Sequence, residues 1–126
     1  MNRELEDKLK EIRTEDFIWV IYIVIIFLSW YANELERKYF INKDIISKEK
    51  YRKIMILIFS ILLIVYYYFF NDSLNSINNL GYGASPDKIK LNYLSLIASI
   101  FIFLSGVIFL YIAIEDKDID VEIAFN

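Results

Sequence analysis

Within the apolar parts of this chain, the side chains that could act as nucleophiles are serine hydroxyls. Ser95, Ser99 and Ser105 share one charge-free run, but a serine nucleophile needs a neighbouring base to take its proton. The chain has no histidine, the commonest general base and metal ligand, and no cysteine, so thiolate, disulfide and sulfur-metal chemistry are missing. A serine hydroxyl in a helix can also donate a hydrogen bond to the carbonyl oxygen of the residue four positions earlier. The sequence therefore predicts a protein that is not an enzyme, with no catalytic residues, no metal and no cofactor.

Three apolar runs dominate the chain, and none of them contains a charged residue: 17–32, 54–70 and 91–114. A helix needs roughly 17 to 25 apolar residues to cross the hydrocarbon core of a bilayer. Hydrophobic residues make up 57% of the 126 residues, more than in typical soluble domains. The sequence predicts an all-α membrane protein with three transmembrane helices. Charge-free spans disfavour pumps, ion-coupled transporters and voltage sensors, which keep costly charges in the membrane for a purpose.

Glycine and proline mark where the helices end. Residues 1–80 contain neither, and apart from Gly106 they fall between Gly81 and Pro86. We therefore predict helices that extend beyond the bilayer within a single membrane domain. The predicted segments are a helix over 1–41, a turn over 42–46, a helix over 47–80, a loop over 81–85, a helix over 86–115 and a tail over 116–126. Ser85-Pro86-Asp87 is the clearest start signal, and Asp44 or Ser47 is expected to cap the second helix.

The first helix is expected to begin near Arg3, outside the membrane. Leu5, Leu9 and Ile12 recur on one face, and Glu4 pairs with Lys8 on another. The segment before the first span is net acidic and no small-residue cleavage site follows it, so we expect a retained span rather than a cleaved signal.

Basic residues predict the orientation. Lysine and arginine number four before the first span, seven between spans one and two, two between spans two and three, and one after span three. The densest group should stay in the cytoplasm, which puts the N-terminus outside and the C-terminus inside. Richness in Ile, Asn, Lys and Tyr is typical of AT-rich bacterial or phage genomes, so we expect a bacterial plasma (cell inner) membrane. The basic side chains expected to contact anionic lipid, at about 1 kcal/mol each, are Lys48, Lys50, Arg52 and Lys53.

Small residues form one face of the third span: Ser95, Ser99, Gly106 and Ala113. Small residues let helix backbones approach closely in lipid, which drives helix association. This face either packs on the other spans of the same chain or contacts another copy or another protein.

The acidic tail has a period of two. Its apolar residues alternate with Asp118, Asp120, Glu122 and Ala124, and they are Ile119, Val121, Ile123 and Phe125. The alternation predicts a short extended strand, which cannot be stable alone. The tail is therefore either disordered or a partner-docking segment that adds to a sheet edge, preferably on a basic surface.

The leading hypothesis is a non-enzymatic interaction subunit that assembles with itself or with a larger membrane complex. Its expected partners are lipids and membrane proteins, and no nucleic-acid or small-molecule site is evident. The alternative is a pore-forming oligomer, because the chain resembles three-span phage holins in size, span number and external N-terminus. That resemblance implies membrane permeabilisation, with Ser95, Ser99 and Ser105 facing the pore. The acidic tail departs from the basic tail usual in such holins.

Overall fold

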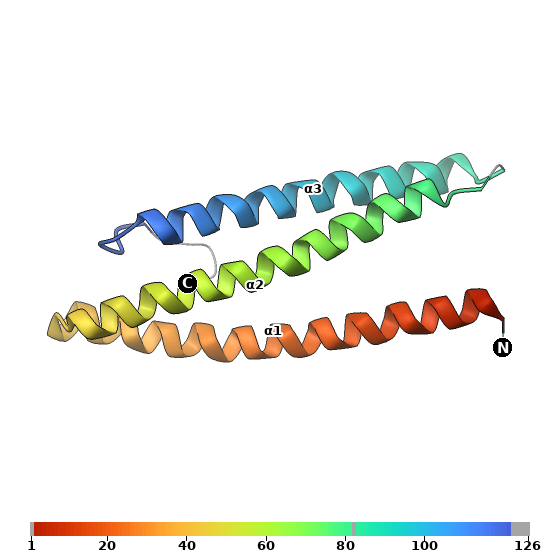
Figure 1. Cartoon of the computed structure of the whole chain (residues 1–126). Coiled ribbons are helices and arrows are strands. Elements are labelled where there is room, and N and C mark those ends of the chain that lie inside the picture. The colour runs from red at the N-terminus through yellow and green to blue at the C-terminus, as the bar shows by residue number, and fades with distance from the viewer. Residues whose placement is uncertain (1, 82, 122–126) are drawn as a thin grey trace. The chain divides into compact units, whose positions relative to one another are not determined.

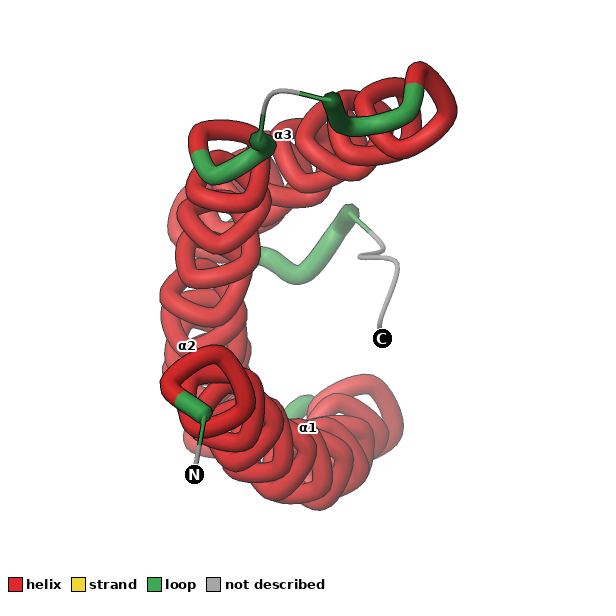
Figure 2. The backbone as a smooth tube through the Cα atoms, turned by 90° about the vertical axis from the view of Figure 1, so that its right-hand side faces the viewer, coloured by secondary structure: helices red, strands yellow, loops and turns green. Residues whose placement is uncertain are grey.

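Three long helices make up the computed structural model, which describes residues 2–81 and 83–121. They are α1 (Arg3–Asn42), α2 (Ile45–Asn78) and α3 (Pro86–Glu115) (Figure 1). The described residues contain helices and loops but no strand (Figure 2). Each helix is long and apolar enough to cross a membrane. The prediction of an all-α, three-span integral membrane protein is confirmed.

The helices are longer than a bilayer requires. At 1.5 Å per residue, the 40 residues of α1 extend about 60 Å and the 34 of α2 about 51 Å, against roughly 30 Å for a hydrocarbon core. In α1 and α2 the apolar run is therefore only the middle part of a longer helix, whereas the run of α3 ends one residue before the helix does.

The chain divides into two compact units. The first, within residues 2–54, holds α1 and the first turns of α2. The second, within residues 55–121, holds the rest of α2 and α3.

In the first unit, a two-residue turn joins α1 to α2. Lys43 adopts the left-handed conformation (φ 56°, ψ 36°), and its N–H donates to the Tyr39 carbonyl at 2.8 Å, which closes α1. Asp44 caps α2: one carboxylate oxygen accepts from the Ile46 N–H at 3.1 Å and the other from the Ser47 hydroxyl at 2.8 Å. The turn is thus shorter than the 42–46 segment expected from the sequence, because the cap lies directly after the left-handed residue.

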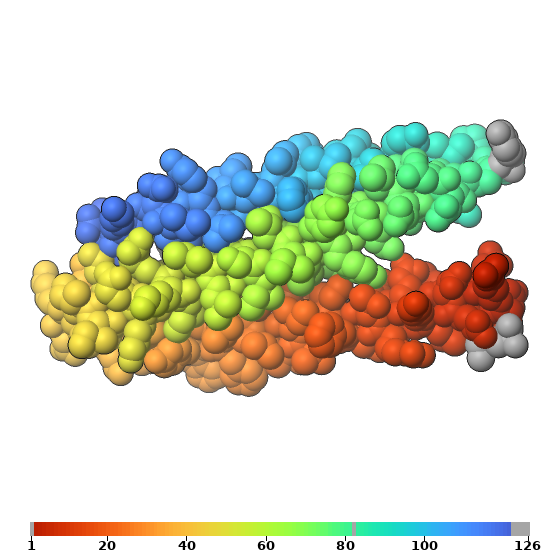
Figure 3. All heavy atoms as spheres, in the orientation of Figure 1, coloured from red at the N-terminus to blue at the C-terminus, as the bar shows by residue number. Residues whose placement is uncertain are grey.

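In the second unit, α2 and α3 run antiparallel in a fixed register. Ring centroids lie 5.6 Å apart for Phe59 and Phe109 and 6.2 Å apart for Tyr67 and Phe103. Side chains of the two helices meet in the space-filling view (Figure 3). Ser85 caps α3 by accepting from the Lys88 N–H at 3.2 Å, and Pro86 occupies the first helical position.

The tail after α3 turns instead of extending. The Asp116 carboxylate accepts from the Asp120 N–H at 3.0 Å and from the Val121 N–H at 2.7 Å, and Ile119 has φ 58°. The strand prediction is therefore wrong for Ile119 and Val121, because a nearby carboxylate captures the amides that a ladder would need. Ile123 and Phe125 lie outside the described residues.

Candidate interaction surfaces

The small-residue face of α3 lies against α2 of the same chain. Ser99, Gly106 and Ala113 are buried, whereas Ser95 is exposed. A Cβ atom on Gly106 would come within 2.9 Å of Tyr66 Cδ2 and 3.3 Å of Leu63 Cδ1. Gly106 therefore permits a contact that no other residue type allows without movement of the Tyr66 ring. These contacts are those of the first alternative given above, in which the small-residue face packs on another span of the same chain.

Three serine hydroxyls lie together near the end of α2, where α2 and α3 meet. Ser73 Oγ lies 2.9 Å from Ser99 Oγ and 3.5 Å from Ser95 Oγ, and the Ser99 hydroxyl also lies 2.9 Å from the Ser95 carbonyl oxygen. Ser73 and Ser99 thus share a hydrogen bond between the two helices, whereas Ser95 is exposed. Ser105 is exposed on another side of α3.

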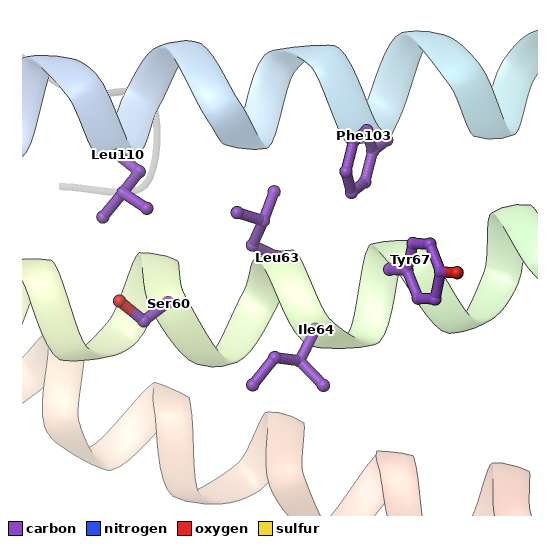
Figure 4. Close-up of a pocket in the computed structure, with 6 residues that line it drawn as sticks. All are labelled: Ser60, Leu63, Ile64, Tyr67, Phe103 and Leu110. Atoms are coloured by element: carbon purple, nitrogen blue, oxygen red, sulfur yellow. The ribbon is translucent and has the colours of Figure 1, made fainter.

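A shallow apolar groove lies between α2 and α3, with a volume of about 460 Å³. Figure 4 shows Leu63 pointing toward α3 between Phe103 and Leu110. The other lining residues are Ser60, Ile64 and Tyr67. The Ser60 hydroxyl donates to the Ile56 carbonyl at 2.7 Å, so it is already satisfied.

The turn joins two charged helix ends, which we call the charged hairpin (residues 33–54). Lys48 Nζ lies 5.3 Å from the Tyr39 ring centroid, a cation–π contact between α1 and α2. Arg37 pairs with Glu34, and Arg52 lies 3.9 Å from Glu49. These polar contacts act beside a small buried core of the hairpin, which includes Leu35 and Tyr51.

The four predicted lipid-contacting cations differ in exposure. Lys50 and Lys53 are exposed, whereas Lys48 is half-buried and the Arg52 side chain is 18% exposed. Lys48 and Arg52 contribute to hairpin packing, so Lys50 and Lys53 are the better placed to meet headgroups.

Large apolar side chains surround the turn, and we call this cluster the apolar tip. Its members are Phe40, Ile41, Ile45 and Ile46, with exposed fractions of 55%, 70%, 61% and 68%. The tip was missed from the sequence because its two apolar pairs are short and flank a charged turn. The pattern Phe-Ile, Asn-Lys-Asp, Ile-Ile is the signal that marks it.

Asp44, in the turn, is a titratable group at the tip whose pKa is shifted by its surroundings. The hydrogen bond from the Ser47 side chain lowers the pKa of Asp44 below its ordinary value of 3.8; the Ser47 and Ile46 N–H groups and the charge of Lys38 act in the same direction. The cap is therefore ionised at neutral pH, where a negative charge favours the N-terminus of α2.

No cluster of three histidine, cysteine or carboxylate side chains suited to a metal ion occurs among the residues that the structure describes. In comparisons with protein-family models, curated proteins and solved structures, nothing matches this chain.

Proposed function

We propose that this protein is a non-enzymatic assembly subunit of a bacterial plasma membrane. It associates with copies of itself or with a larger membrane complex. The charged hairpin and the acidic tail are its docking surfaces on the cytoplasmic side, and the N-terminus is outside.

The observation that carries this proposal is the exposure of the apolar tip. In α1, Phe40 and Ile41 lie eight and nine residues after Ala32, the last residue of the apolar run, so the tip stands about 12–14 Å beyond the hydrocarbon core. Headgroups account for only about 5–7 Å of that distance. A cluster of large apolar side chains at such a position is typical of an interaction site.

The charges of the two docking surfaces support an assembly role. Residues 33–53 contain seven basic and four acidic side chains, and residues 115–122 contain one basic and five acidic side chains. Three crossings put both segments on the same side of the membrane. The hairpin thus suits acidic partner surfaces and the tail suits basic ones, which favours specific association over chance contact.

The test is native mass spectrometry of the full chain in lipid nanodiscs and mild detergent. We expect a stable oligomer or a co-purifying membrane protein, and loss of that species in the Phe40→Ser/Ile41→Ser variant. Deleting residues 118–126 should weaken the same association. Leu74→Ser is the matched control, since Leu74 is exposed on α2 but far from the tip along that helix. A wild-type chain that stays monomeric and unaccompanied at every concentration would refute the proposal.

Of the three serines in the pore alternative, Ser99 is buried and engaged with Ser73, whereas Ser95 and Ser105 are exposed. Dye release from vesicles that contain the purified chain would establish the pore function in place of the assembly function.

A further inference from the structure

One end of the apolar run of α2 is level with one end of the apolar run of α3. Phe59 and Phe109, whose ring centroids lie 5.6 Å apart, are each five residues from such an end, at Ile54 in α2 and at Ile114 in α3. The two runs differ in length, with 17 residues in α2 and 24 in α3. The difference therefore falls at the other end of the pair, where α2 becomes polar.

The length that α3 needs sets the depth of this polar part of α2. Glu115 and Asp116 end the apolar run of α3, and a helix needs at least about 17 apolar residues to cross the hydrocarbon core. The span of α3 therefore reaches at least to Ala98 and includes Ser99. Because Ser73 Oγ lies 2.9 Å from Ser99 Oγ, the core extends along α2 at least as far as Ser73.

The part of α2 that lies at this depth is rich in asparagine. The sequence over 71–79 is Asn-Asp-Ser-Leu-Asn-Ser-Ile-Asn-Asn. Asn71 lies within even the shortest span, and Asn75 lies about 3 Å further along α2 than Ser73, inside the span of roughly 20 residues that a bilayer usually holds. Asp72 shares this depth but is half-buried on another side of α2. A carboxamide at this depth has no water with which to bond.

Three of these asparagines lie on one exposed face of α2, which we call the α2 ridge. Its residues recur every seven positions, with Asn75 beside them, and they are Leu57, Ile64, Asn71 and Asn78. Leu57 is 48% exposed and Ile64 is 72% exposed. The three asparagines are exposed as well, so the ridge faces outward from the pair along its whole length.

The asparagine side chains of the ridge lack partners. Among the residues that the structure describes, the carboxamides of Asn71, Asn75 and Asn78 make no hydrogen bond. Helix α3 contacts another side of α2, through Tyr66 and Ser73. An amide in an apolar environment is costly without a hydrogen bond, and acyl chains cannot supply one. The ridge therefore needs a cover that offers hydrogen-bond donors and acceptors.

A second copy of the chain carries the matching cover. A carboxamide both donates and accepts, so it pairs with an identical group. Every copy inserts with the same topology, and a two-fold axis along the membrane normal puts each asparagine level with its equivalent. A seven-residue repeat is what two parallel helices need for a continuous seam, and no ridge residue is charged.

The one carboxyl near the ridge does not oppose this pairing. Asp72 lies on one flank of the ridge, and in a parallel pair the two copies of that flank lie on opposite sides of the seam. Each Asp72 would instead face the other flank of the second copy, which contains Tyr67. A tyrosine hydroxyl can donate to a carboxylate, so this contact is complementary.

We propose that the α2 ridge pairs with the α2 ridge of a second copy within the bilayer, and that Asn71 and Asn75 form hydrogen bonds between the copies. Leu57 and Ile64 supply the apolar part of the seam, and Asn78 ends it near the headgroups. This inference rests on the proposed assembly function and names an interface inside the membrane, in addition to the docking surfaces outside it.

The first test locates α2 in the bilayer by cysteine labelling of the full chain in vesicles, since the chain contains no cysteine of its own. We expect a membrane-impermeant maleimide to label Asp87→Cys and to leave Leu74→Cys as unlabelled as Leu104→Cys. If Leu74→Cys is labelled as readily as Asp87→Cys, the asparagines stand in water and the inference is wrong.

The second test identifies the occupant with chains that carry one cysteine each, so that a disulfide forms only between copies. We expect oxidation in the bilayer to give dimers of Ile64→Cys and of Asn78→Cys. Leu104→Cys, at a position 50% exposed on α3, is the control and should give little dimer. Equal dimer yields at all three positions, or none at the two ridge positions, would mean that the ridge is not the contact between copies.

The final measurement is the oligomer population of Asn71→Leu/Asn75→Leu in native mass spectrometry from nanodiscs. Leucine suits lipid better than asparagine does, so α2 still inserts, but the hydrogen bonds are lost. We expect about tenfold weaker pairing. Asn33→Leu, at an exposed position directly after the apolar run of α1, should leave pairing unchanged. Unchanged or stronger pairing in the double variant would reject this interface while leaving the proposed function standing, whereas a monomeric wild-type chain would remove both.

Discussion

The α2–α3 pair and the charged hairpin are held together by different kinds of contact. In the pair, small residues allow close contact: Gly106 accepts the Tyr66 ring, and Ser73 bonds Ser99. In the hairpin, the turn is defined by backbone caps and a cation–π contact, and the large apolar residues of the tip point outward. The comparison teaches that small residues set the close approach of α2 and α3, whereas in the hairpin polar caps fix the turn and Leu35 and Tyr51 supply the buried contacts.

The largest expected effect is on the pair. Gly106→Val adds atoms where a Cβ already comes within 2.9 Å of the Tyr66 ring, so we expect the free energy of unfolding in micelles to fall by about 1–3 kcal/mol. Ser105→Val is the matched control, because Ser105 is exposed one residue away. Equal stability of the two valine variants would show that the close approach of α2 and α3 does not exist.

The second prediction sharpens the division among the hairpin cations. We expect Lys50→Gln/Lys53→Gln to lower the enrichment of anionic lipid around the protein, at about 1 kcal/mol for each lysine. Lipids that co-purify from mixed nanodiscs are counted by mass spectrometry. Arg52→Gln should change lipid enrichment less, because its side chain is only 18% exposed. A larger loss for Arg52→Gln than for the lysine pair would reverse the assignment.

Much of the fold is predictable from the sequence, and the reasons are physical. Charge-free runs fix the three spans because lipid excludes charge, and Ser85-Pro86-Asp87 fixes the start of α3 because capping is local. The partner of Gly106 is not predictable, since a small residue accepts any close helix. The tip was missed because two short apolar pairs have no helical period. The tail strand was predicted wrongly over 119–121, because alternation does not reveal that the Asp116 carboxylate bonds the amides.

A smaller effect is expected from the serine contact within the pair. In a double-mutant cycle, Ser73→Ala and Ser99→Ala should show a coupling free energy of about 0.6 kcal/mol, the average for hydrogen bonds between helices in a membrane protein. Unfolding in micelles measures it. Ser76→Ala is the control, because the Ser76 hydroxyl donates to the Asp72 carbonyl of its own helix. Coupling of zero would mean that apolar contacts alone hold this end of the pair.

The smallest effect tests the polar cap of the hairpin through pH. The pKa of Asp44 is lowered in the folded chain by the Ser47 hydrogen bond, so the folded state prefers the ionised carboxyl. The stabilisation is complete above the ordinary value of 3.8 and is lost as the pH falls through the lower folded value.

Protection of the Ile46 amide from hydrogen exchange should therefore decrease at acid pH in the wild-type chain. In Asp44→Asn, which keeps an oxygen acceptor but cannot titrate, the protection should not change over this range. Ser47→Ala should move the transition to higher pH, because the main cause of the lowered pKa is removed. If the transition stays in place in Ser47→Ala, the Ser47 hydroxyl does not set the cap. The contrast between an apolar pair and a polar turn would then depend on the cation–π contact of Lys48 with Tyr39.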